Sequence, residues 1–80
     1  MRGGSAIRHF DAAVRFDPLY SAAWKLLGKA LAQMDHVEKA VAAYDAGIAA
    51  ATQKGDKQAA KEMTVFRKRL VKPLTEPPPA

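Results

Sequence analysis

The side chains able to carry out acid–base or nucleophilic chemistry are few in this chain. His9 and His36 are its two histidines, and neither belongs to an H-E-x-x-H or comparable metal-binding pattern. Ser5 and Ser21 lack the glycine-flanked context of a nucleophile elbow, and Ser21 fits better as the start of a helix. Cysteine is absent, which excludes disulfides and cysteine-ligated metals. We therefore expect no enzyme activity, no metal site and no cofactor.

Basic side chains offer a different chemistry, the binding of anions. Seven basic residues between Lys54 and Lys72 stand against two acidic ones, so this segment accounts for the whole net charge of +5. Three of them, Lys57, Lys61 and Lys68, fall on one face of a helix. Such a face could contact the phosphates of nucleic acid or another polyanion. No aromatic residue lies among them to stack on bases, and an ordinary solvated helix surface explains the same pattern.

Two segments with apolar residues at helical spacing predict the helices that position the basic side chains. They run from about residue 20 to 34 and from about residue 36 to 52, and a very short turn separates them. Asp35, followed three residues later by Glu38, has the spacing of a capping box. We therefore predict an antiparallel helix pair whose second helix has Asp35 as its N-cap.

Each side of this pair carries a further helix. The first is expected at residues 5–16, after a disordered lead-in of residues 1–4, and it should end at Asp17-Pro18 because a residue before proline leaves the helical region. The last is expected at residues 56–72, with Asp56 as N-cap and Pro73 as the stop, before a disordered proline-rich tail of residues 73–80. An apolar stripe should pack this last helix onto the rest of the chain; it consists of Ala59, Met63, Phe66 and Leu70.

A pattern of small and aromatic residues repeats along the chain with an offset of 40 − 6 = 34 residues. Small residues let a neighbouring helix approach closely, and an aromatic ring fills the space between helices. The repeated pairs are Ala6 and Ala40, Phe10 and Tyr44, and Ala13 and Gly47.

With this period the chain resembles the tetratricopeptide-repeat family, whose pattern is W-x2-L-G-x2-Y…A-x3-F…P. Trp24, Leu27 and Gly28 match the first helix of that pattern, and Leu31 replaces its tyrosine. Ala40 and Tyr44 match the second helix, and Pro18 matches the proline that closes the preceding repeat. The corresponding closing position of the central repeat is Thr52, which departs from the pattern.

The resemblance implies an all-α fold of antiparallel helical hairpins in a right-handed superhelix. It would comprise a half repeat at 5–18, a full repeat at 20–53 and a capping helix at 56–72. It also implies a non-catalytic protein-interaction module whose first helices line a groove for a peptide or partner segment. The implied groove positions are Ala22, Lys25, Lys29, Ala32 and Gln33.

One subgroup of the family clamps the C-terminal carboxylate of chaperones, and Lys25 matches its clamp lysine. Lys29 stands where that clamp has asparagine, and the chain contains no asparagine, so we do not expect chaperone clamping. Lys25 and Lys29 lie four residues apart on one helical face, and we expect them to hold one carboxylate of an acidic peptide between them. Two alternatives stay open: a basic adaptor for a polyanion, and the end of a longer scaffold with no ligand of its own.

The helix at residues 5–16 would lack the first helix of its own repeat. Its apolar residues Ile7, Phe10 and Val14 should then be partly uncovered, which predicts self-association or a missing upstream helix in a longer protein. The sequence contains neither a run of about 18 apolar residues nor the pattern of a signal peptide. We therefore expect a cytoplasmic protein with no membrane span.

Overall fold

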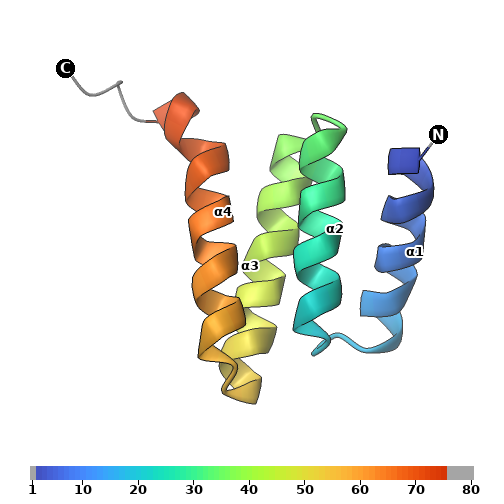
Figure 1. Ribbon diagram of the computed structural model, residues 1–80, viewed down its shortest axis with the longest axis vertical. Helices are drawn as coiled ribbons and strands as arrows, with labels where there is room; N and C mark the ends of the chain where they lie inside the picture. The colour runs from blue at the N-terminus through green and yellow to red at the C-terminus, as the bar shows by residue number, and fades with distance from the viewer. Residues whose placement is uncertain (1, 76–80) are drawn as a thin grey trace.

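The computed structural model of the protein describes the backbone of residues 2–75 and the side chains of residues 5–71. Within that range it consists of four helices: α1 (Arg2–Phe16), α2 (Ser21–Gln33), α3 (Val37–Lys54) and α4 (Lys57–Thr75). The helices run up and down in the order of the sequence, as the colours of Figure 1 show. The predicted all-α fold of helical hairpins is confirmed.

The four helices form two staggered rows. Each helix packs against its neighbour in the sequence, and α2 in addition touches α4, whereas α1 and α3 make no corresponding contact. The Cα atoms span 44 × 34 × 14 Å, and 14 Å is enough for two rows because packed helix axes lie about 8–10 Å apart. One side of the molecule is therefore formed by α2 and α4, and the opposite side by α1 and α3.

Two clusters of buried side chains hold these rows together. One joins α1, α2 and α3 around Val14, Leu27 and Leu31, and the other joins α3 and α4 around Tyr44 and Met63. Trp24 packs against both clusters, and its indole Nε1 donates a hydrogen bond of 2.7 Å to the Pro18 carbonyl. This tryptophan therefore connects the turn after α1 with the core of the α2–α3 hairpin.

Two residues without a side chain allow the closest helix contacts. A Cβ atom on Gly28 would lie 2.5 Å from Cε1 of Tyr44, and one on Gly47 would lie 2.6 Å from Cβ of Trp24. Both distances are shorter than real carbon contacts, and a Cβ atom on Gly47 would also clash with Met63 of α4, so the packing of α3 against α2 and α4 requires both glycines. The remaining repeat positions on α2 and α3, Leu27, Leu31, Ala40 and Tyr44, are also buried.

The turn between α2 and α3 differs from the prediction. The N-cap of α3 is His36, not Asp35, and it makes no side-chain capping bond. Asp35 instead adopts a left-handed conformation, with φ of 63°. The His36 N–H donates to the Leu31 carbonyl and the Asp35 N–H to the Ala32 carbonyl, which is the Schellman pattern that ends a helix. Asp35 therefore terminates α2, and the predicted capping box does not form.

The turn between α3 and α4 follows the prediction more closely. Gly55 takes the left-handed position, with φ of 79°, and the Asp56 N–H donates to the Ala51 carbonyl at 2.8 Å. The Asp56 carboxylate then accepts a hydrogen bond of 3.1 Å from the Ala59 N–H. Asp56 is thus the N-cap of α4, as the sequence predicted.

The outer ends of α1 and α4 extend beyond their predicted bounds. Helix α1 begins at Arg2 and includes Gly3 and Gly4, which the sequence analysis placed in a disordered lead-in. Helix α4 continues through Pro73 to Thr75; a proline in the last turn removes a single backbone hydrogen bond. Met1 and residues 76–80 of the predicted tail lie outside the described residues.

Candidate functional site

A groove of about 460 Å³ runs between α2 and α4, on the side of the molecule that these two helices form. Four basic side chains and one acidic side chain line it, together with two apolar ones and a glutamine. The lining residues are Lys25, Lys29, Gln58, Lys61, Glu62, Val65, Phe66 and Arg69.

An ion pair crosses the groove and joins its two helices. Lys25 Nζ lies 3.1 Å from Glu62 Oε1, and Gln58 Nε2 lies 3.4 Å from the other oxygen of the same carboxylate. The hydrogen bond from Lys25, then that from Gln58, and the Lys25 charge lower the pKa of Glu62. The carboxylate partner of Lys25 is therefore a residue of the protein itself.

Lys29 lies beside an aromatic ring instead of sharing that carboxylate. Its Nζ atom is 5.8 Å from the centre of the Phe66 ring, within the range of a cation–π interaction. The Phe66 ring in turn packs 5.9 Å from the ring of Tyr44, and burial raises the pKa of the Tyr44 hydroxyl. In the structure, Lys25 and Lys29 thus make two separate contacts with α4.

The structure distributes the five predicted groove residues unequally. Lys25 and Lys29 line the groove, whereas Ala22, Ala32 and Gln33 do not. Ala22 and Gln33 are exposed, and Ala32 packs against the core cluster of α1, α2 and α3. Six of the eight lining residues come from α4, among them Glu62 and Phe66, which the repeat pattern did not select. Their positions beside the half-buried Ala59 and the buried Met63 on α4 were the signal that could have found them.

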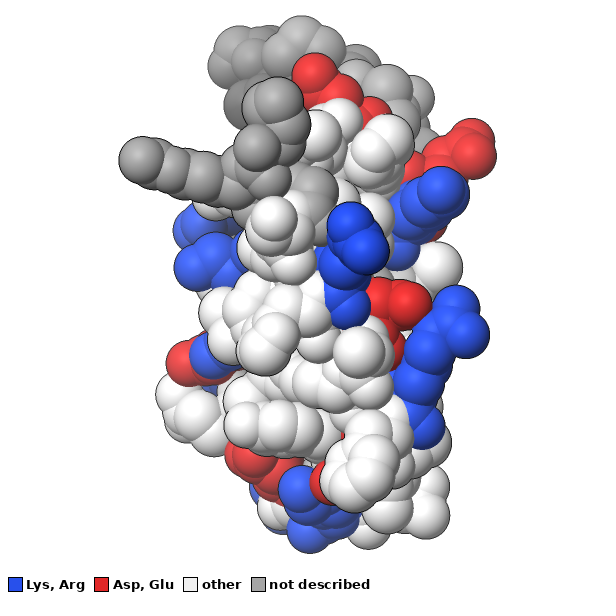
Figure 2. All heavy atoms as spheres, turned by 90° about the vertical axis from the view of Figure 1, so that its right-hand side faces the viewer, with Lys and Arg blue, Asp and Glu red and all other residues white. Residues whose placement is uncertain are grey.

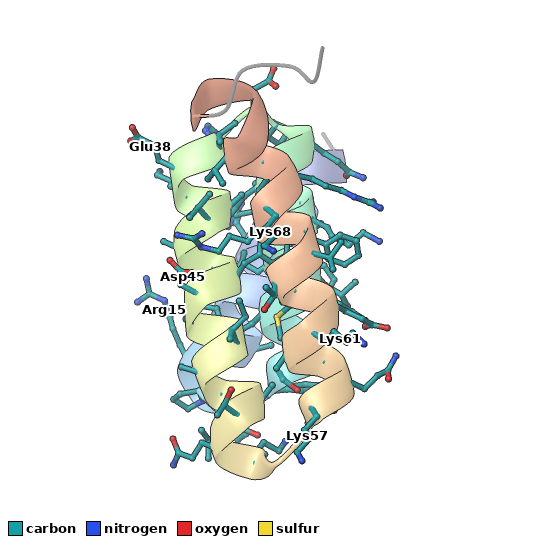
Figure 3. All side chains as sticks on the ribbon, turned by 90° about the vertical axis from the view of Figure 1, so that its left-hand side faces the viewer. Arg15, Glu38, Asp45, Lys57, Lys61 and Lys68 are labelled. Atoms are coloured by element: carbon teal, nitrogen blue, oxygen red, sulfur yellow. The ribbon has the colours of Figure 1, made fainter. Side chains whose placement is uncertain are left out.

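The basic residues of α4 that were considered for polyanion binding lie mostly away from this groove. Lys57, Lys61 and Lys68 are all exposed, and Figure 3 shows them spaced along α4 from its lower end upward. Lys61 belongs both to this row and to the groove. The neighbouring Arg67 pairs with Asp45 of α3, so it does not add a free charge to the row.

The side chains considered for catalysis do not come together. His9 is exposed and packs edge-on against Phe10, and His36 is exposed in the turn before α3. Ser21 is buried at the start of α2. Among the described residues, no three His, Asp or Glu side chains gather as a metal site would need. The helices of this part of the chain include none with the length and hydropathy of a membrane span.

Comparisons with known proteins agree with this architecture. No family model matches the chain. Over 65 residues it is 49% identical to the TPR repeat-containing protein PA0015 of Pseudomonas aeruginosa, an alignment that covers 81% of this chain and 62% of that protein. The predicted resemblance of the central hairpin to a tetratricopeptide repeat is therefore confirmed. In the pattern of that repeat, α2 takes the place of the first helix and α3 that of the second.

A solved structure has a similar arrangement of helices. The solution structure of protein BPP2914 from Bordetella parapertussis matches with a TM-score of 0.79 and 44% sequence identity, over 89% of this chain and 62% of that chain. The chain thus spans a little under two thirds of the length of each relative. In terms of the repeat, the groove lies between the first helix, α2, and the helix that follows the repeat, α4.

Proposed function

We propose that the chain is a non-catalytic protein-interaction module, and that its α2–α4 groove holds an acidic, partly apolar peptide segment. The observation that supports this most directly is the composition of the groove: Lys25, Lys29, Lys61 and Arg69 face one acidic residue, Glu62. The tetratricopeptide repeat shared with the Pseudomonas relative supports the general class of protein binding.

The apolar part of the peptide would contact α4. Val65 is 41% exposed at the groove, and the Phe66 ring beside it is partly buried. Contact with these two side chains removes apolar surface from water, which contributes roughly 25 cal/mol per Å². An exposed charge pair contributes only about 0.2–1 kcal/mol, so an acidic peptide without an apolar side chain should bind poorly.

The acidic part of the peptide would contact Lys29, Lys61 and Arg69. Lys25 is already paired with Glu62 at 3.1 Å, so a carboxylate that bound to Lys25 would have to displace Glu62. The three other cations have no carboxylate partner among the described residues. We therefore expect the acidic residues of the peptide to lie toward Lys29 and Arg69.

The test compares two double variants that each remove two positive charges. Peptides with acidic and apolar residues, and scrambled and basic controls, are titrated into the labelled protein by NMR. Lys29→Ala/Arg69→Ala should weaken binding several-fold, whereas Lys57→Ala/Lys68→Ala, on the outer face of α4, should leave it nearly unchanged.

The opposite outcome favours the second candidate function, binding of a polyanion. The row of exposed lysines along α4 (Figure 3) is the observation that supports it. Binding of single-stranded nucleic acid that is lost in Lys57→Ala/Lys68→Ala and falls steeply with salt would replace the peptide groove as the functional site. Peptide binding that is equally sensitive to both double variants would also contradict the groove proposal.

A further inference from the structure

The groove between α2 and α4 changes in chemistry along its length. Four of its α4 residues follow one another at intervals of one helical turn and form a stripe: Gln58, Glu62, Val65 and Arg69. The stripe spans about 16 Å, since a helix rises about 1.5 Å per residue, and it runs from an amide and a carboxylate through an apolar side chain to a guanidinium group. The two ends of the groove, which we name the Gln58 end and the Arg69 end, therefore present different charges to a bound peptide.

The Gln58 end contains the one acidic side chain that lines the groove. Glu62 Oε1 lies 3.1 Å from Lys25 Nζ of α2, and its other carboxylate oxygen accepts a hydrogen bond of 3.4 Å from Gln58. The side chains of Lys25 and Glu62 are 31% and 41% exposed, so a bound peptide would meet this pair at the surface. Lys61 lies about 100° away round the helix and borders the groove at its edge. Because Glu62 already balances the charge of Lys25, an approaching carboxylate gains little from Lys25 and is repelled by Glu62.

The Arg69 end carries positive charge that is not balanced in this way. Arg69 of α4 and Lys29 of α2 both line the groove, and neither belongs to an ion pair among the described residues. Lys29 lies one turn beyond Lys25 on α2, and its Nζ atom is 5.8 Å from the centre of the Phe66 ring. A carboxylate at this end would therefore meet two positive charges close to the apolar part of the groove.

The α1 end of the molecule differs from the groove in charge. Arg15 pairs with Asp11 at 2.8 Å, and Figure 2 shows basic and acidic side chains close to one another around an uncharged area at this end. Of the apolar residues of α1 that were predicted to be uncovered, Val14 is only 3% exposed, and Ile7 and Phe10 pack partly against the core. Because its charges are mixed, the α1 end attracts an acidic peptide less strongly than the Arg69 end of the groove does.

We propose that Glu62 determines the specificity of the groove: it excludes an acidic residue from the Gln58 end and so places the acidic residues of a bound peptide at the Arg69 end. This inference rests on the peptide-binding function proposed above and adds the order of residues that the groove selects. Specificity of this kind comes from a repulsive contact with the wrong ligand as well as from attraction of the right one. Lys29 and Arg69 supply the attraction, and Glu62 supplies the repulsion.

The spacing of the stripe gives the order of residues in the peptide. Arg69 and Val65 are four residues apart on α4, about 6 Å along the helix, and two residues of an extended chain span a similar length at about 3.3 Å each. Side chains two residues apart also lie on the same face of an extended chain. An acidic residue at Arg69 therefore places an apolar residue, two positions away, at Val65. The next residue on that face meets Glu62 and has to be non-acidic.

The test uses two capped pentapeptides that differ at one position, Asp-Ser-Leu-Ser-Gln and Asp-Ser-Leu-Ser-Glu, each titrated into the labelled full chain by NMR. The wild-type protein should bind the peptide with Gln roughly two- to fivefold more tightly, which is the effect of one exposed charge pair. In Glu62→Gln this preference should vanish or reverse, because Lys25 becomes free. Glu38→Gln is the matched control: it removes the same charge from an exposed residue outside the groove and should keep the preference. The ratio of two affinities for one variant is insensitive to a change in its stability.

The outcomes separate this inference from the function on which it rests. Equal binding of both peptides to the wild-type protein, or a preference that persists in Glu62→Gln, would show that Glu62 does not determine the specificity, while the groove remains a peptide site. Failure of both peptides to bind at millimolar concentration would overturn the proposed function and this inference with it.

A nitroxide attached to the Asp end of the peptide with Gln tests where that end lies. It should broaden the backbone amide signals of Lys29 and Arg69 more than that of Gln58, which lies about 16 Å from Arg69 along α4. Stronger broadening at Gln58 would place the acidic residue at the wrong end of the groove and overturn the proposal.

Discussion

Gly28 of α2 lies directly against the aromatic ring of Tyr44 of α3, and a Cβ atom at residue 28 would approach three ring carbons to 2.5, 2.7 and 2.8 Å. Tyr44 is itself buried at 2% exposure, so its ring has little room to move. This contact sets how closely the two helices of the hairpin can pack.

Gly28→Ala should therefore destabilise the protein. Overpacking of a filled core costs about 1–3 kcal/mol, which exceeds the gain of about 1 kcal/mol that alanine brings to a helix. Urea denaturation measures the difference. In a Tyr44→Leu background, where the ring is absent, the same substitution should cost clearly less; equal costs in both backgrounds would show that the ring contact is not the cause.

Asp35→Gly should stabilise the protein, by up to about 1 kcal/mol. Asp35 has φ of 63° and its side chain makes no capping bond to α3, so glycine relieves backbone strain without loss of a contact. Asp56→Ala is the contrasting variant, since it removes the bond to the Ala59 N–H and should cost roughly 0.5–2 kcal/mol. A loss of stability in Asp35→Gly would mean that Asp35 caps α3 after all.

Trp24→Ala should unfold the protein or leave it only partly folded. Truncation of a large aromatic core residue costs about 3–5 kcal/mol, of the order of the whole stability of a small domain, and Trp24 packs against both core clusters. Trp24→Phe keeps the ring and loses the bond to the Pro18 carbonyl, so it should cost only about 0.5–1.5 kcal/mol plus lost packing. A thermal melt of Trp24→Ala within a few degrees of wild type would contradict this.

The Lys25–Glu62 pair should make stability depend on pH in the acidic range. The pKa of Glu62 is lowered from its ordinary value of 4.5 in the folded protein, so the pair stabilises the fold above that value. This contribution is lost as pH falls below it, because the unfolded chain then binds the proton more readily. NMR titration of the Glu62 carboxyl should show its pKa rise in Lys25→Ala. Lys29 makes no hydrogen bond to Glu62, so Lys29→Ala should leave the pKa of Glu62 unchanged.

The sequence was sufficient for the helices and for the order in which they pack. Apolar spacing predicted four helices. The 34-residue recurrence of small and aromatic residues, such as Gly47 and Tyr44, predicted close contacts between neighbouring helices. The stripe of Ala59, Met63, Phe66 and Leu70 also packs as predicted. These features depend on local periodicity, which a sequence shows directly.

Two kinds of feature could not be predicted from the sequence. One is the choice between alternative structures within a short turn, and the other is contact between residues far apart in the chain. In the short turn after Met34, Asp35 could either end α2 or begin α3. It ends α2, because it adopts the left-handed conformation that terminates a helix. Lys25 and Glu62 are 37 residues apart, and their pairing follows only once α2 and α4 are known to touch. The same holds for the groove, because six of its eight lining residues come from α4 and the other two from α2.

The staggered arrangement of the helices also implies that the helices do not all unfold together in local opening events. Among the described helices α1 packs against α2 alone, while α2 and α3 each pack against two or more others. Amide protons of α1 should therefore exchange with solvent through a low-energy local opening, and those of α2 and α3 only through rarer, larger ones.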